Sequence, residues 1–461
     1  MKQQKIFFDF LRFCIGSAKE IPDSLKEVDW KELYAIAKKQ CLVGVLFDGI
    51  KKLPAEHVGM KKELLLQWMA ESQMLEKANV RLNDAAIQVS EWFRKKGFRT
   101  CILKGQGNTL LYPNPYSRIP GDIDIWVEGG DKRVISFVRS ISPHEKACYH
   151  HIEFPSYKGV EVEVHYRPSF LLCFWHNRKL QKYYERVKEE QFSQRVMLGE
   201  QGEIAIPTVE FNLIFQLTHI FSHLMNEGIG LRQLLDYYYV LCDFYKVYQN
   251  FSKTHPSSLT LKGGSTAFPK PLFNGLYTPF GSPVSGGQKP QGTGDVTAPP
   301  RRSEPLRSKV GGPSKVSPDC AGWDRLSIEG DNSAGSTTAV TSSASTALDV
   351  VQKELKELGL WKFAGGIMYI MQEVFGMPAS RLIVPPNEKY GKFVLNEVLE
   401  AGNFGRHDAR NRFGRSQLGH NLQRVYRDIR LVRYFPAEAL CEPLFRIWHF
   451  FWRLKYKKLN N

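Results

Sequence analysis

The sequence of 461 residues predicts an α/β fold of the α+β kind, in which a small mixed sheet lies between helical N- and C-terminal regions. Two patterns support this prediction. Near both ends of the chain, apolar residues recur at three- and four-residue spacing, which is the period of helices. Between these regions, short β-rich runs stop at glycines, which is typical of strands. Helices and strands that follow one another in this way predict an α/β unit.

The N-terminal region, residues 1–95, is expected to be helical. The helical period begins in DWKELYAIAKKQCLVGVLFDGIKKL and continues in KELLLQWMAESQMLEKANVRLNDAAIQVSEWFRKKG. The second stretch closes on Gly97 after a basic last turn, as helix ends often do.

Residues 96–208 are expected to form the core that contains the sheet. FRTCILKG is a short β-rich run, and DIDIWVEGG alternates polar and apolar residues before it stops at two glycines. VISFVRSI predicts a helix. HHIEFPSYKGVEVEVHYRPS predicts a hairpin with Lys158 and Gly159 in the turn.

The C-terminal helical domain is expected to comprise residues 209–249 and 347–461, with an insertion at 250–346 between its two parts. The insertion is dominated by Pro, Gly, Ser and Thr and shows little periodicity. We predict that it is disordered, because it has too little apolar surface to offset its ordering entropy. The last helix, LFRIWHFFWRLKYKKLNN, has apolar residues on all sides. That pattern favours packing in the core over binding to a membrane surface.

Composition limits the partners and the compartment. The net charge of +16 indicates an anionic partner, namely a nucleotide, a nucleic acid or an acidic membrane surface, although a basic surface without a partner explains the charge equally well. The eight cysteines are scattered without a C-x-x-C pair, which argues against a zinc ribbon, a redox motif or a disulfide scaffold. No stretch has the features of a signal peptide or a transmembrane segment. We therefore expect a cytoplasmic protein.

Two aspartates in the segment Gly121-Asp122-Ile123-Asp124 are the strongest candidates for chemistry. Alternate side chains of a strand share a face, so both carboxylates should point the same way. Two carboxylates this close repel each other unless a cation lies between them. A hard divalent ion with oxygen ligands suits that arrangement.

Three neighbouring features strengthen this hypothesis. Lys104 and Gly105 lie between a predicted strand and a helix, where backbone can approach a phosphate. Arg118 lies just before the aspartates and could also bind phosphate. The later strand VEVEVHYRPS places Glu161, Glu163 and His165 on one face, and a third carboxylate there would complete a two-metal site.

A glycine-bearing turn, a D-x-D strand and a later carboxylate resemble the DNA polymerase β-like nucleotidyltransferase superfamily. LKGQGNTLLYPNPYSRIPGDIDIWV and HHIEFPSYKGVEVEVHYRPS are similar to a bacterial family of uncharacterised nucleotidyltransferases. The stretches GLRQLLDYYYVL, LGLWKFAGGIMYIMQEVFG and PLFRIWHFFWR also resemble that family. The resemblance covers nearly the whole chain except the insertion. The usual glycine-serine turn of the superfamily is Lys104-Gly105 here.

The resemblance implies a nucleotidyltransferase core that moves NMP from an NTP, with ATP as the expected donor, to an unknown hydroxyl acceptor, and releases pyrophosphate. The acceptor could be a protein, a small molecule, a glycan or an RNA. Asp122, Asp124 and Glu163 would be the catalytic residues and would bind Mg²⁺ or Mn²⁺, with Glu161 as the alternative to Glu163. The residues implied in nucleotide binding are Lys104, Gly105, Arg118 and Gly121. The oligomeric state is not indicated.

Two other classes of function remain open. A catalytically weak protein with the same fold would bind nucleotide or a partner without turnover. A nucleic-acid-binding module, suggested only by the net charge, would bind in a strongly salt-dependent way.

Several further residues have a structural and a functional interpretation. His219 and His223 lie four residues apart on a predicted helix, and packing or capping is favoured over metal binding because no H-E-x-x-H pattern is present. His150 and His151 flank the proposed site, where acceptor contact and a surface position are equally supported. Arg232 and Asp236 can form an i,i+4 ion pair, and a structural pair is slightly favoured.

Overall fold

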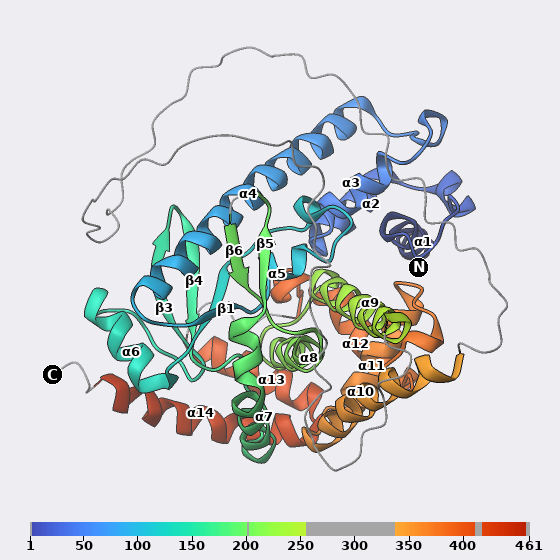
Figure 1. The fold of residues 1–461 in the computed structure, drawn as a ribbon. Helices are drawn as coiled ribbons and strands as arrows, with labels where there is room; N and C mark the ends of the chain where they lie inside the picture. Colours follow the sequence, from blue (N-terminus) through green and yellow to red (C-terminus); the bar gives the residue numbers. More distant parts are fainter. Residues whose placement is uncertain (1, 201, 255–336, 411–416, 458–461) are drawn as a thin grey trace, which may run out of the picture.

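The computed structural model describes residues 2–200, 202–254, 337–410 and 417–457. Figure 1 shows a small sheet with a long helix, α4, across it, and helices from both ends of the chain packed beside the sheet. The predicted α/β class, with a mixed sheet and helical flanks, is confirmed. None of the described helices combines the length and the apolar character needed to cross a membrane.

The N-terminal region is helical as predicted, with α1 (Lys2–Ile15), α2 (Trp30–Lys39), α3 (Val43–Ile50) and α4 (Lys62–Lys95). The Asp29 side chain accepts hydrogen bonds from two backbone amides of the first turn of α2, which fixes where that helix begins. After α4, Gly97 takes a φ of +80°, a conformation that glycine adopts without steric cost. The helix therefore ends where the sequence predicts.

The sheet consists of β1 (Thr100–Ile102), β2 (Ile123–Val127), β3 (His151–Tyr157) and β4 (Val160–His165). Its strand order is β1-β2-β4-β3, with β2 and β4 parallel and the other two pairs antiparallel. Strands β3 and β4 form the predicted hairpin. Lys158 and Gly159 in its turn have φ of 50° and 79°, the positive values that a tight hairpin turn of this kind requires.

The two faces of the sheet have different environments. Apolar side chains such as Ile125 and Val164 pack in one core with Phe93 of α4 and Val138 of α6 (Gly130–Ile141). The side chains that alternate with them, including Asp124, point to the opposite face. This alternation is the pattern that the sequence predicts for both strands.

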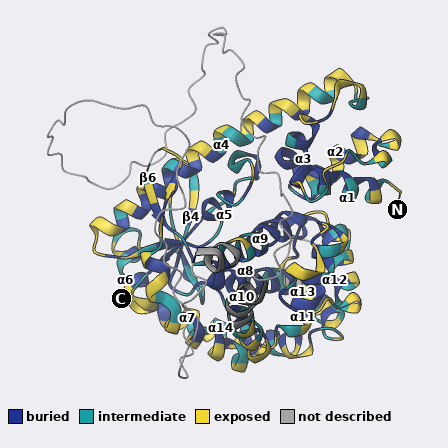
Figure 2. Ribbon diagram, turned by 45° about the vertical axis from the view of Figure 1, so that its right-hand side comes forward, coloured by how far each residue is buried: buried dark blue, intermediate teal, exposed yellow. Residues whose placement is uncertain are grey.

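The rest of the chain adds one small hairpin and a series of helices. The sequence does not predict the helix α7 or the hairpin of β5 and β6. For the hairpin, the reason is that four-residue strands carry too few alternating positions to be recognised. Residues 209–249, which the sequence predicts to be helical, contain α8 and most of α9, and Figure 2 shows α8 lying among other helices. The elements are α5 (Gln106–Thr109), α7 (Phe174–Ser193), β5 (Arg195–Leu198), β6 (Gly202–Ala205), α8 (Val209–Asn226), α9 (Leu231–Thr254), α10 (Thr337–Glu357), α11 (Trp361–Glu373), α12 (Glu388–Ala401), α13 (Gln417–Leu431) and α14 (Pro436–Lys457).

The N- and C-terminal helices share one hydrophobic core. Phe7 and Leu46 of the N-terminal region belong to the same buried cluster as Phe221, Ile367 and Val398. Helix α9 extends to Thr254 and α10 begins at Thr337, so both run a few residues into the segment 250–346 that was predicted as a disordered insertion. The remainder of that prediction, residues 255–336, lies outside the described residues. The division into domains stays a prediction.

Candidate functional site

Three carboxylates meet where β2 and β4 run side by side. The parallel register pairs Asp124 of β2 directly with Glu163 of β4. Asp122 lies just before β2, two residues from Asp124, and therefore reaches the same face. One carboxylate oxygen from each of the three residues lies within 4.8 Å of the other two. The parallel register of β2 and β4 thus brings the acidic side chains of the two strands together.

Glu161 does not join this group. It is exposed and lies two residues before Glu163 on β4, outside the pairs that join β2 and β4. Of the two glutamates that the sequence leaves open, the structure brings Glu163 to the aspartates.

Two cationic side chains surround the Asp124 carboxylate, which is 1% exposed. Lys104 Nζ lies 3.1 Å from its Oδ2, and His165 Nε2 lies 3.0 Å from its Oδ1. Burial alone would raise the pKa of Asp124, but Lys104 and the hydrogen bond with His165 lower it overall. Burial opposes the charged form of His165, yet Asp124 and Glu163 raise its pKa to about 9. The positive charge of both neighbours therefore keeps Asp124 ionised.

The site fits a divalent cation. Asp124 Oδ2 contacts Lys104 as an ion pair but accepts no hydrogen bond from the described residues. A lone pair of this buried oxygen is therefore available to a cation. Three carboxylates offer only hard oxygen ligands, which Mg²⁺ and Mn²⁺ prefer. A bound cation would replace the positive charge that Lys104 and His165 supply to Asp124 in the protein alone.

The turn after β1 brings Lys104 beside the carboxylates. Gly105 has a φ of +62°, and the direction of its absent Cβ faces the backbone oxygen of Asp122. This conformation favours glycine and lets the two backbone segments approach. The helix that follows, α5, has one turn only, so its dipole contributes little to anion binding. Gly121 is exposed just before the aspartates, near a guanidinium nitrogen of Arg232.

Arg118 is held elsewhere by a buried ion pair. Its guanidinium donates two hydrogen bonds of 2.8 Å to the carboxylate of Asp236 on α9, and Tyr112 donates a third of 2.6 Å. Asp236 therefore pairs with Arg118, and the expected pair with Arg232 is wrong. Arg232 instead donates to the backbone oxygen of Ile119. A role of Arg118 in phosphate binding stays a prediction.

A cavity of about 480 Å³ opens in front of the carboxylates. Its walls come from distant parts of the chain. The core contributes Lys104, Asp122 and Glu163, and α8 contributes His219 and His223. The volume is within the usual range of a site for a small ligand.

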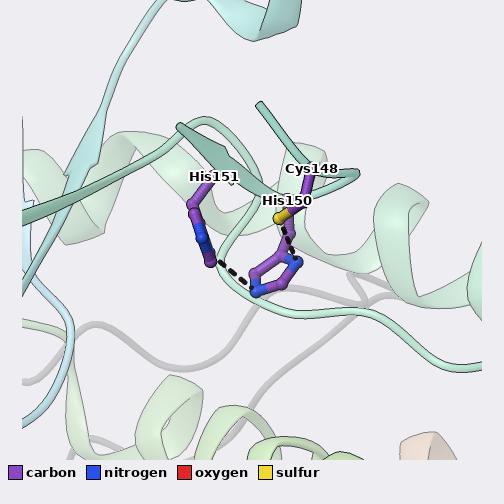
Figure 3. Close-up of side chains that lie close together, drawn as sticks. All are labelled: Cys148, His150 and His151. Atoms are coloured by element: carbon purple, nitrogen blue, oxygen red, sulfur yellow. Dashed lines mark hydrogen bonds between the residues drawn. The ribbon is translucent and has the colours of Figure 1, made fainter. Parts of the chain in front are cut away.

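Histidines form much of the cavity wall. Figure 3 shows His150 between Cys148 and His151, with contacts of 3.4 Å from its Nδ1 to Cys148 Sγ and 3.1 Å from its Nε2 to His151 Nδ1. Burial, followed by the charge of His151, lowers the pKa of His150 well below its usual value. His150 is therefore a neutral imidazole near pH 7. His151 Nδ1 also lies 3.2 Å from Glu163 Oε2, so the contacts of Cys148, His150 and His151 continue to the carboxylates.

The two α8 histidines are not simply packed in the core. His219 Nε2 lies 3.0 Å from Lys104 Nζ, and His223 contacts His219 at 2.9 Å. Burial, followed by Lys104, lowers the pKa of His219 well below its usual value. A neutral His219 can accept a hydrogen bond from the Lys104 ammonium. This bond would hold the ammonium group beside the carboxylates.

Sequence patterns did not identify the residues that the C-terminal helices add to the cavity. These residues lie more than two hundred positions from Asp122 in the chain, so no local spacing links them to the site. Arg406 and Arg424 have no carboxylate partner among the described residues, whereas Arg446 pairs with Glu442. The lining residues from this region are Phe404, Arg406, Arg424, Glu442, Phe445, Arg446 and His449.

Comparison with known proteins gives one finding. A family model described as an uncharacterised nucleotidyltransferase matches residues 26–247. The match contains Lys104 and the three carboxylates, and it ends before the C-terminal residues that line the cavity. Comparisons with curated proteins and with solved structures give no match.

Proposed function

We propose that this chain, whose residues 26–247 match a family model described as an uncharacterised nucleotidyltransferase, transfers NMP from an NTP, with ATP as the expected donor, to a hydroxyl acceptor. Asp122, Asp124 and Glu163 would bind the divalent cations, and pyrophosphate would be released. The observation that carries the proposal is the convergence of these three carboxylates, within 4.8 Å, at a cavity that also contains Lys104.

In the proposed reaction, an acceptor oxygen attacks the α-phosphorus and the bond to the β-phosphate oxygen breaks. Pyrophosphate leaves, and the proton of the hydroxyl passes to solvent. Asp122, Asp124 and Glu163 would hold Mg²⁺ or Mn²⁺, which would supply positive charge for the attacking and leaving oxygens. The acceptor could be a protein, a small molecule, a glycan or an RNA.

The side chains of the chain itself would bind and orient the substrate. Lys104 lies beside Asp124 and is oriented by His219, so its ammonium would neutralise phosphate charge next to the cations. Arg406 and Arg424 also line the cavity, and neither has a carboxylate partner among the described residues. Their charges are available for the leaving phosphates or for an anionic acceptor.

The test is incubation of the protein with each α-labelled NTP and Mg²⁺ or Mn²⁺, with and without cell extract as a source of acceptors. We expect label on an acceptor with wild-type protein and none with the Asp122→Asn, Asp124→Asn double variant, because two of the three cation ligands lose their charge. Label transfer that survives in the double variant would place the chemistry elsewhere.

The same experiment separates the other classes of function. Metal-dependent NTP binding without transfer would favour a catalytically weak nucleotide-binding protein. Binding to nucleic acid that weakens steeply with salt and does not depend on Asp122 or Asp124 would favour a nucleic-acid-binding module.

A further inference from the structure

Two helix N-termini meet outside the catalytic cavity, and each carries two metal-binding side chains three residues apart. Cys173 occupies the N-cap position of α7 and His176 lies in its first turn, while Glu438 and Cys441 lie in the first two turns of α14. Figure 1 shows α7 and α14 side by side, and Phe174 packs against Phe445 between them. Residues three apart on a helix face the same way, so each helix directs both of its side chains to the junction.

Three of the four side chains lie together, and Cys441 lies next to this group on the side of Cys173. His176 Nδ1 lies 3.1 Å from Glu438 Oε1, and ligand atoms of Cys173, His176 and Glu438 all lie within 4.8 Å of one another. The Cys441 thiol is within hydrogen-bonding reach of the Cys173 thiol. Cys173 and Glu438 are buried, whereas His176 and Cys441 are partly exposed. The cluster is thus closed on one side and open to solvent on the other, which gives an ion a path of entry.

The surroundings hold two of these side chains in place. Glu438 Oε2 accepts the backbone N–H groups of Leu172 and Cys173, which leaves Oε1 facing His176. The His176 ring packs against Gly359, where a Cβ would overlap it. A carboxylate and an imidazole that are oriented by their neighbours in this way are typical of metal ligands.

The chemistry and the spacing suit zinc. Two thiols, an imidazole and a carboxylate are ligands that Zn²⁺ takes in a tetrahedral site. Bonds of about 2.0 to 2.3 Å to such ligands place neighbouring ligand atoms roughly 3.3 to 3.8 Å apart. The contact of 3.1 Å between His176 and Glu438 is close to that spacing. Cys441 lies outside the group of three, so its side chain would have to turn toward His176 and Glu438 to complete the tetrahedron.

We propose that Cys173, His176, Glu438 and Cys441 bind one structural Zn²⁺ that fixes the start of α14 to the start of α7. The site lies outside the carboxylate group and does not depend on nucleotidyl transfer. Its effect would reach the cavity through α14, because Glu442, Arg446 and His449 of that helix line the cavity. Zinc would therefore stabilise the part of the cavity wall that α14 contributes.

The test is the zinc content of protein that was purified under reducing conditions and gel-filtered in metal-free buffer. We expect about one zinc per chain for a single four-ligand site. Cys441→Ser and His176→Gln should lose it. Cys242→Ser, a partly buried helical cysteine outside the cluster, is the matched control and should retain it. Co²⁺ in place of zinc should give the absorption of a tetrahedral thiolate site, weakened in Cys441→Ser.

Glu438→Gln distinguishes a metal ligand from a helix cap, because glutamine keeps an acceptor for the two amides but loses the charge. We expect this variant to fold and to bind zinc at least tenfold more weakly. Wild-type protein without zinc, or with a Cys173–Cys441 disulfide under reducing conditions, would overturn the proposal. Zinc that is retained in Cys441→Ser but lost in Cys148→Ser would also overturn it, since the ion would then lie in the cavity.

Discussion

Glu163→Gln is expected to lower kcat/KM for nucleotidyl transfer by about a hundredfold or more, because a cation ligand contributes several kcal/mol of charge stabilisation in the transition state. Glu161→Gln, on the same strand, is expected to change it by less than about twofold, since surface substitutions away from a site are nearly neutral. The reason lies in the register, which pairs Glu163 with Asp124 and leaves Glu161 exposed. Steady-state kinetics with the labelled NTP would measure both variants.

The pair of glutamates also provides a control for folding. Both substitutions remove one negative charge from β4, so a general effect of charge on stability would appear in both. Equal losses of activity, or a greater loss in Glu161→Gln, would contradict the assignment of the third carboxylate. Weaker Mn²⁺ binding in Glu163→Gln alone would support it.

Asp236→Ala is expected to lower the free energy of unfolding by about 3 to 5 kcal/mol, because it leaves a buried cation without its partner. Arg118 and Asp236 are 5% and 7% exposed at their side chains, and two hydrogen bonds join them. The neighbouring Arg232 is also buried, so the variant would leave two guanidinium groups without a counter-charge there. Urea unfolding monitored by circular dichroism would measure the change.

An exposed ion pair provides the comparison. Lys158 and Asp84 lie 2.9 Å apart with side chains that are 61% and 35% exposed, and Asp84→Ala should cost less than about 1 kcal/mol. The double variant Arg118→Met, Asp236→Leu should recover most of the stability that Asp236→Ala loses, since an apolar pair leaves no buried charge. If Arg118→Met instead abolishes NTP binding at unchanged stability, Arg118 acts on phosphate rather than on the fold.

The sequence predicted the structural features that depend on residues close together in the chain. The hairpin at Lys158 and Gly159 follows from a turn that needs two positive φ angles, and the end of α4 follows from Gly97. The alternation around Asp124 predicted which side chains share a face of β2. In each case, the residues that determine the structure lie within a few positions of one another.

The pairing of Asp236 could not be decided in the same way. Spacing along α9 places Arg232 one turn away, and that local pair was the natural expectation. The fold instead brings Arg118, from the segment before β2, into bidentate contact. The choice depends on how α9 packs against that segment, which spacing in the sequence does not specify.

The sequence predicts a β-rich core with four acidic candidates between helical regions, because strand alternation and helical period are local properties. The tertiary structure determines which glutamate joins Asp122 and Asp124, because the register of β2 against β4 is a contact between distant segments. It also decided that Lys104, the α8 histidines and the C-terminal arginines surround one cavity. Those residues meet only when helices from both ends of the chain pack around a common core, as the burial of apolar surface requires.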